Sequence, residues 1–339
     1  MAFGSELSTG HPIRVGNVGA GTKPGRMDPL RIITAGEGFF TRREAKNAGY
    51  ADREITAVVR QGAWHRIRRG AYVFADEWAA LDAVGRHRVR ARAVQRSLGG
   101  KIALSHVSGM VAHGIDLWGV DLAKVHVTRL DGAGRPLEGD VVHHLGAVGE
   151  DEVETRDGLR TLPAVRCALE TSLQADDEVT QCLLDAGLRA TAFTKAELIA
   201  EYERMNQWPF SHPLGAAVAH ADPLSGSIGE SRCLWLFRVG GLPRPELQVP
   251  VYRADGSLVG IVDFAWPQFR LFGEFDGRVK YGKLLRPGQA PSDAVFEEKR
   301  REDEIREITD YGFVRVIWDD LDSPRRTLGR FESRMRIAS

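Results

Sequence analysis

The chain has 339 residues and carries 46 basic and 46 acidic side chains, so its formal net charge is zero. Its hydrophobic and charged fractions are those of folded globular proteins, and its length suffices for two or three domains. No apolar run approaches the roughly 18–20 residues of a membrane span, and no apolar signal core begins the chain, so we expect neither a membrane nor a secreted protein. The three scattered cysteines favour buried thiols and a cytoplasmic location.

Positive charge is concentrated near the N-terminus. Residues 41–101 contain 14 Lys and Arg against 6 Asp and Glu, a net charge of +8 that the rest of the chain offsets. A basic segment in a neutral chain is typical of a module that binds phosphates.

Residues 1–26 are rich in Gly, Ser and Thr, and we expect a disordered extension, or upstream sequence if translation begins at Met27. Residues 27–76 predict a compact domain. Short helices are expected over 29–35, 42–48 and 53–61, with Thr41 and Asp52 as the caps of the second and third. Residues 64–74 place apolar side chains around an Arg-Arg-Gly turn, which predicts a hairpin with a basic tip.

Two short helices joined by a glycine-containing turn and followed by a basic hairpin form a winged helix-turn-helix. The third helix would then present its polar face to the major groove of DNA, and the hairpin would meet phosphates or the minor groove. The candidate DNA-binding side chains are Arg42, Arg43, Arg53, Thr56, Arg60, Arg66, Arg68 and Arg69. A winged helix can instead bind a protein, and this alternative stays open.

The same segment resembles a known family. The runs Thr41-Arg-Arg-Glu-Ala and Arg68-Arg-Gly-Ala-Tyr-Val73 look like those of the AbiEi-type antitoxin N-terminal domain of type IV toxin–antitoxin systems. The resemblance implies a regulator that binds double-stranded DNA and has a cognate toxin as its protein partner.

Residues 77–220 predict a middle α/β domain that resembles the corresponding region of the same proteins. A basic helix is expected over 86–98, a strand over 125–128 and helical structure from Glu170 to about Gln207. The segment from Asn206 to Leu214 is typical of a linker, which places a domain boundary near residue 220. Five histidines suggest a metal site, but no pair has the spacing of a defined one, which favours structural roles. They are His106, His113, His126, His143 and His144.

Residues 221–339 predict a further α/β arrangement. A helix is expected over 225–237 and strands over 247–252, 258–267 and 269–277. A charged helix over 294–308 and a closing strand over 313–318 follow. This order resembles the α/β/α core of the PD-(D/E)XK superfamily, in the branch related to very-short-patch-repair endonucleases.

The resemblance implies a catalytic site made of carboxylates. Asp263 corresponds to the aspartate that closes the second strand, Glu274 and Asp276 to the acidic pair of the third, and Glu230 to the glutamate of the first helix. Side chains at i and i+2 of a strand share a face, so Glu274 and Asp276 point together and Asp263 can join them. Clustered carboxylates repel unless a cation neutralises them, and oxygen ligands suit Mg²⁺ or Mn²⁺. The alternative is that these acids are solvated strand ends.

The lysine of the superfamily is missing. It belongs two residues after Glu274, where the chain has Asp276, and Lys280 and Lys299 are the candidates to replace it.

The whole sequence predicts an α+β protein with a winged helix-turn-helix, a mixed α/β middle region and a PD-(D/E)XK-like core. The expected function is a metal-dependent DNA endonuclease related to defence or toxin–antitoxin systems. One alternative is a DNA-binding repressor or antitoxin-like regulator whose nuclease fold is inactive. Another is an interaction module that controls a partner toxin.

Overall fold

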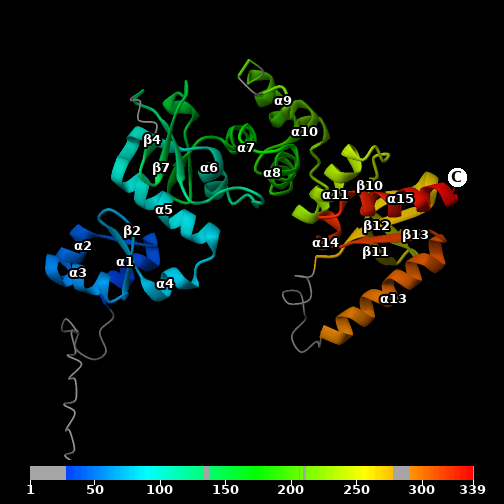
Figure 1. Cartoon of the computed structure of the whole chain (residues 1–339), viewed down its shortest axis with the longest axis horizontal. Helices are drawn as coiled ribbons and strands as arrows, with labels where there is room; N and C mark the ends of the chain where they lie inside the picture. The colour runs from blue at the N-terminus through cyan, green and yellow to red at the C-terminus, as the bar shows by residue number, and fades with distance from the viewer. Residues whose placement is uncertain (1–27, 133–136, 206, 209–210, 278–290, 339) are drawn as a thin grey trace, which may run out of the picture. The chain divides into compact units, whose positions relative to one another are not determined.

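The computed structural model describes residues 28–132, 137–205, 207–208, 211–277 and 291–338 (Figure 1). The chain divides into two compact units, one up to Asp82 and one from Ala83 onward. Both contain helices and strands, which confirms a mixed α+β protein. The predicted extension over 1–26 and the candidate Lys280 lie outside the described residues.

The first unit combines short helices with a three-stranded antiparallel sheet in the order β1-β3-β2. Its core is largely aromatic, since Phe40, Trp64, Tyr72 and Phe74 pack around Ile55. The predicted helices and hairpin are confirmed. The elements are α1 (Pro29–Glu37), β1 (Phe40–Thr41), α2 (Arg42–Asn47), α3 (Asp52–Arg60), β2 (Trp64–Arg68), β3 (Ala71–Phe74) and α4 (Ala75–Ala80).

The caps of α2 and α3 differ in kind. Thr41 caps α2 as predicted, because its hydroxyl accepts from the N–H of Glu44, whose carboxylate accepts from the N–H of Thr41 at 2.7 Å. The prediction that Asp52 caps α3 is wrong, since the cap position is Ala51 and Asp52 is the first helical residue. Glu54 accepts from the N–H of Ala51 at 2.6 Å, and this leaves Asp52 to pair with Arg42 at 3.1 Å.

The second unit begins with a mixed six-stranded sheet in the order β6-β7-β5-β4-β9-β8. Helices α5 (Ala83–Leu98) and α6 (His106–His113) pack on it, and Val94 of α5 joins Leu104 and Val127 in the core. The basic helix and the strand predicted in this region are confirmed. The strands are β4 (Ile102–Leu104), β5 (Val125–Arg129), β6 (Leu137–Glu138), β7 (Val141–Leu145), β8 (Glu154–Arg156) and β9 (Leu159–Thr161).

Helices α7 (Ala164–Ser172), α8 (Asp177–Arg189), α9 (Lys195–Arg204) and α10 (Leu214–His220) follow. The helical stretch predicted from Glu170 is thus divided among three helices. The predicted linker is followed at once by α10, whose Ala217 and Val218 are buried in the same core as Leu183 of α8. A domain boundary near residue 220 stays a prediction, because α11 (Ile228–Val239) also contacts α8.

The last part is a four-stranded sheet between two helical layers. Its order is β10-β11-β12-β13, with β12 and β13 parallel and the other neighbours antiparallel. Helices α11 and α15 cover one face through Phe237 and Phe331, and α13 covers the other through Ile305 (Figure 1). The elements after α11 are β10 (Glu246–Tyr252), β11 (Leu258–Trp266), β12 (Leu271–Phe275), α13 (Pro291–Thr309), β13 (Gly312–Val316), α14 (Trp318–Leu321) and α15 (Pro324–Ala338).

The predicted order of helix, three strands, helix and strand is confirmed here. The closing strand is shorter than predicted, since it ends at Val316 and Trp318 opens α14. The sequence did not predict α14 and α15. Within the described ranges, no helix is long and apolar enough to cross a membrane.

Candidate functional site

Helix α3 presents a polar face to solvent. Arg53, Thr56 and Arg60 are three and four residues apart, so they share one side of the helix, and all three are exposed. The opposite side packs into the core through Ile55 and Val58. Among the described residues, Arg53 and Arg60 form no ion pair, so both guanidinium groups are available to a ligand.

The β2–β3 hairpin adds further positive charge. Arg66 and Arg69 are exposed and Arg68 is half-buried. The turn closes at Gly70, whose φ of +77° suits a glycine. The Nε of Arg66 donates to the carbonyl of Arg68 at 3.4 Å, where the pairing register shifts.

The two arginines that open α2 differ. Arg43 is exposed, whereas Arg42 lies against Asp52. Hydrogen bonding to Tyr72 and the charge of Asp52 raise the pKa of Arg42. Of the predicted DNA-binding side chains, Arg42 is therefore one that already has an acidic partner within its own unit.

Glu230 acts as a structural acceptor at the start of α11. It is buried and accepts from the N–H of Gly226 at 2.7 Å and the hydroxyl of Ser227 at 2.9 Å. The side-chain amide of Gln248 on β10 donates to it at 3.0 Å. Sequence reasoning missed Gln248, whose φ of +51° is unusual for a strand residue.

Asp263 lies in the same neighbourhood as Glu230. One carboxylate oxygen accepts from the backbone N–H of Phe275 at 2.8 Å, which joins β11 to β12 where their regular pairing ends. Burial raises the pKa of the Cys233 thiol, and the charges of Asp263 and Glu230 raise it further. Both acids therefore lie close enough to Cys233 of α11 for their charges to act on its thiol.

Glu274 and Asp276 are held by arginines. Glu274 is buried and lies 2.7 Å from Arg301 of α13. Arg315 of β13 lies 3.8 Å from Glu274 and 3.6 Å from Asp276, and it also donates to Glu302 at 2.6 Å. The shared contact with Arg315 agrees with the predicted common face of the two acids.

Guanidinium groups thus supply positive charge where the sequence led us to expect a metal ion. Within the described part of the chain, the three carboxylates Asp263, Glu274 and Asp276 do not form a cluster close enough to hold one metal ion. Lys299 is exposed on α13. Sequence reasoning missed Arg301, although its spacing of four residues from the apolar Ile305 places both on one helix face.

Four of the histidines that the sequence singled out differ in their contacts. His113 bonds to the carbonyl of Leu162 at 2.9 Å, as a structural histidine does. His106, His126 and His144 instead gather in one place. Burial and the neighbouring His106 lower the pKa of His126 to about 4 and that of His144 to about 3, so both rings are neutral at pH 7.

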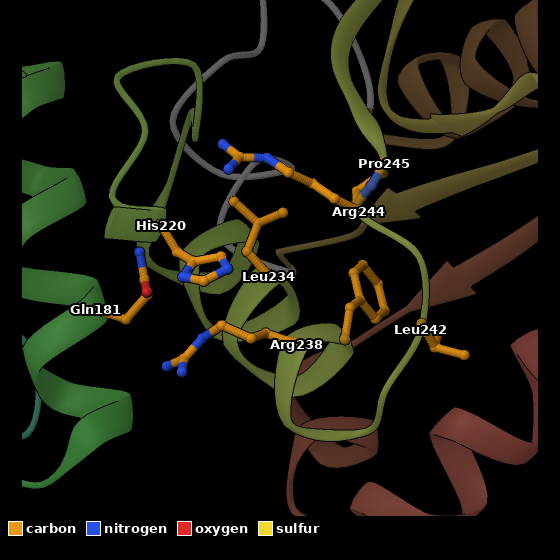
Figure 2. Close-up of a pocket in the computed structure, with 8 residues that line it drawn as sticks. Gln181, His220, Leu234, Arg238, Leu242, Arg244 and Pro245 are labelled. Carbon is orange, nitrogen blue, oxygen red and sulfur yellow. The ribbon is translucent and has the colours of Figure 1, made fainter. Parts of the chain in front are cut away.

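A small cavity of about 240 Å³ opens beside α11 (Figure 2). Its wall is apolar at Leu234 and Leu242 and positively charged at Arg238 and Arg244. Arg238 donates to Asp177 and Arg244 to Asp222, each at 2.7 Å, so both charges are already matched.

The N-terminal elements match a known family. Residues 30–75, which span α1 to β3 and the first residue of α4, match the family model of the AbiEi antitoxin, a transcriptional regulator. The chain is also similar to two uncharacterised proteins of Mycobacterium tuberculosis, MT2308 of strain CDC 1551 / Oshkosh and Rv2248 of strain ATCC 25618 / H37Rv. Each is 28% identical over 204 residues, which are 59% of this chain and 68% of the relative. The chain therefore carries an N-terminal domain of the AbiEi antitoxin type.

Proposed function

We propose that the protein is a DNA-binding transcriptional regulator of the antitoxin type, in which α3 enters the major groove of double-stranded DNA. The exposed face formed by Arg53, Thr56 and Arg60 carries this proposal. Further support comes from the order of α1, β1, α2, α3 and the β2–β3 hairpin, which is the order expected of a winged helix-turn-helix, and from the family match to these elements.

The chemistry of this face suits base recognition. A guanidinium group can donate two hydrogen bonds to the edge of one guanine, and such a pair discriminates against the wrong base by roughly 1–3 kcal/mol. Arg66 and Arg69 on the hairpin would contact phosphates, which adds affinity but carries no sequence information.

The test is selection of duplexes from a random pool by the full-length protein, followed by affinity measurements at several salt concentrations. Arg53→Ala and Arg60→Ala should each weaken binding to the selected duplex about 10-fold and relax its sequence preference. Arg66→Ala should weaken binding to all duplexes and reduce the slope of log affinity against log salt by about 0.9.

Arg325→Ala is the matched control, because Arg325 is an exposed arginine of α15 in the other unit. This variant should bind as the wild type does. Unchanged affinity and selectivity in the Arg53→Ala/Arg60→Ala variant would contradict the proposal.

In this proposal the C-terminal domain is a PD-(D/E)XK-type fold whose acids serve the structure. Its support is that Glu230 accepts a hydrogen bond from the N–H of Gly226, Asp263 accepts one from the N–H of Phe275, and Glu274 pairs with Arg301. A cognate toxin is the protein partner that an antitoxin would bind, and co-purification with the product of a neighbouring gene tests this part.

The second candidate is a metal-dependent DNA endonuclease. It is favoured by the position of Asp263 and Glu274, which flank one end of the β11–β12 pairing: Asp263 lies directly before the paired Phe264, and Glu274 directly after its partner Gly273. Asp263, Glu274 and Asp276 would hold Mg²⁺ or Mn²⁺, which lowers the pKa of a bound water. Lys299 or Lys280 would then contact the scissile phosphate.

A nicking assay on supercoiled DNA with Mn²⁺ separates the two candidates. The regulator predicts equal, background nicking by the wild type and by Asp263→Ala/Glu274→Ala, with DNA still bound by both. Cleavage by the wild type that the double variant loses would establish the endonuclease instead.

A further inference from the structure

Three histidines from three separate elements meet on one face of the six-stranded sheet. His126 lies on β5 and His144 on the parallel neighbour β7, where it pairs in register with Thr128. His126 and Thr128 are two residues apart on one strand, so the two histidines share a face. His106 is the first residue of α6, and its ring stacks on that of His144 with 3.6 Å between centroids.

The rings contact one another through their nitrogens. Nδ1 of His126 and Nε2 of His144 are 3.0 Å apart. One ring nitrogen from each of the three histidines lies within 4.8 Å of the other two. His106 is buried, whereas His126 and His144 are half-buried.

A nearby histidine shows what a purely structural role looks like in this fold. His87 is buried, and its ring nitrogens contact the carbonyl of Leu122 at 2.9 Å and the hydroxyl of Ser108 at 2.8 Å. That ring is satisfied by groups of complementary chemistry. Nδ1 of His106 also contacts the hydroxyl of Ser105 at 3.1 Å, but the triad in addition brings one ring nitrogen from each of three histidines together, as a shared ligand requires.

We propose that His106, His126 and His144 bind a divalent transition-metal ion, with Zn²⁺ as the best fit. Imidazole nitrogens are preferred ligands of zinc. Two nitrogens bound at about 2.0–2.1 Å to one tetrahedral zinc ion are about 3.4 Å apart. The observed 3.0 Å and the 4.8 Å limit bracket this separation, so small side-chain rotations suffice.

The surroundings of His106 also suit a metal ligand. Glu170 of α7 is buried, and one of its oxygens lies 3.2 Å from Nδ1 of His106. Its other oxygen accepts from Nε of Arg166 at 3.0 Å, which fixes the carboxylate. Metal-binding histidines commonly donate one ring N–H to such a carboxylate, and this tautomer leaves Nε2 of His106 for the ion.

The backbone angle of His106 and the partial exposure of the other two histidines also suit a metal site. His106 has a φ of +50°, a conformation that is rare for residues other than glycine and is found at ligand sites. Three protein ligands with two half-buried members leave a fourth position for water, as in the open class of zinc site. The site lies in the middle region, to which the proposed DNA-binding function assigns no role.

The experiment uses the untagged full-length chain, stripped with EDTA and titrated with Zn²⁺ against a chromophoric chelator. The wild type should bind one ion per chain. His126→Ala and His144→Ala should each lower the affinity by about 100-fold or more, and Glu170→Gln by about 10–100-fold. His220→Ala, which removes an exposed histidine of α10, is the matched control and should bind as the wild type does.

Co²⁺ gives a second readout, because its visible absorption reports a four-coordinate site, here three histidine nitrogens and one water. The spectrum should appear with the wild type and His220→Ala and disappear with His126→Ala. Circular dichroism in EDTA verifies that each variant folds, and His144→Gln replaces an alanine variant that does not. Equal Zn²⁺ binding by the wild type and by folded triad variants, or no binding by the wild type, would overturn the proposal.

Discussion

At the residue scale, Glu274 shows how the fold neutralises an acid on an inner strand. It is buried, and its ion pair with the partly exposed Arg301 spans 2.7 Å. Replacing Arg301 with alanine leaves Arg315, at 3.8 Å, to compensate for the lost charge. We expect Arg301→Ala to lower the free energy of unfolding by about 2 kcal/mol, because a buried carboxylate loses a charged donor.

Urea unfolding measures this loss. The double variant Arg301→Ala/Glu274→Gln is the control, since it removes the charge that Arg301 compensates and should recover part of the stability. A change below about 0.5 kcal/mol in Arg301→Ala would mean that the pair contributes no more than an exposed one.

Asp185 of α8 provides a pH-dependent prediction. Burial raises its pKa to about 6 from the ordinary 3.8, so the folded state disfavours the charged form. Protonated Asp185 therefore stabilises the folded state. This contribution is fully present below the ordinary pKa and is lost as the pH rises through 6, which lowers the free energy of unfolding by roughly 3 kcal/mol. Asp185→Asn keeps the oxygen that accepts from the N–H of Asp222 at 2.9 Å, but it carries no charge.

The stability of Asp185→Asn relative to the wild type should therefore grow between about pH 4 and pH 6 and then level off. Thermal unfolding of both proteins across this range measures the difference, in which the titrations that they share cancel. A difference that does not vary with pH would show that Asp185 ionises as freely in the folded protein as in the unfolded chain.

At the element scale, the packing of α11 on the sheet depends on the absence of one side chain. A Cβ at Gly229 would lie 2.0 Å from the ring of Phe275 on β12. Gly229→Ala should lower the free energy of unfolding by about 1–3 kcal/mol, because either the helix or the ring must move. Gly329→Ala in α15 is the matched control, since nothing lies within 4 Å of its Cβ position.

The control should be neutral or stabilising by up to about 1 kcal/mol, because alanine is the better helix former. Denaturant unfolding compares the two variants under one condition. Equal effects of the two substitutions would indicate that α11 does not pack closely on Phe275.

Local sequence signals account for the elements that were predicted. Thr41 and Glu44 form the capping box that their spacing indicates, and the strands of the C-terminal sheet follow their apolar runs. At the start of α3 the local sequence indicated the wrong cap residue. Asp52 is a good cap residue in isolation, but Glu54 satisfies the amide of Ala51, and Asp52 pairs instead with Arg42 and Lys46 of α2. The preference of aspartate for helix caps does not predict such contacts with another helix.

The candidate sites show the same division between local and long-range information. Glu274 and Asp276 share a partner because the strand period places them together, which the sequence predicts. Arg315 reaches them through the parallel pairing of β12 with β13. His126 and His144 meet through the parallel pairing of β5 with β7, and the spacing of histidines along the chain does not report a sheet register.

At the scale of the whole molecule, the chain has separate hydrophobic cores in its two units. The core of the first unit contains side chains between Leu30 and Phe74. The remaining clusters draw on residues from Ala91 onward. Each unit thus buries its own apolar side chains, so a core mutation should act on the unit that contains it.

Matched substitutions of isoleucine by valine test this independence. Ile55 is 1% exposed in the first unit and Ile305 is fully buried in the second. Each change removes one buried methylene, which lowers the free energy of unfolding by about 0.5–1.5 kcal/mol.

In calorimetry, Ile55→Val should lower the midpoint temperature of one transition by about 4–8 °C per kcal/mol and leave the other in place. Ile305→Val should shift the other transition by about 2–4 °C per kcal/mol, since the second unit is larger. Movement of both transitions in either variant would mean that the two cores unfold as one, and the first unit would then depend on the C-terminal sheet for its stability.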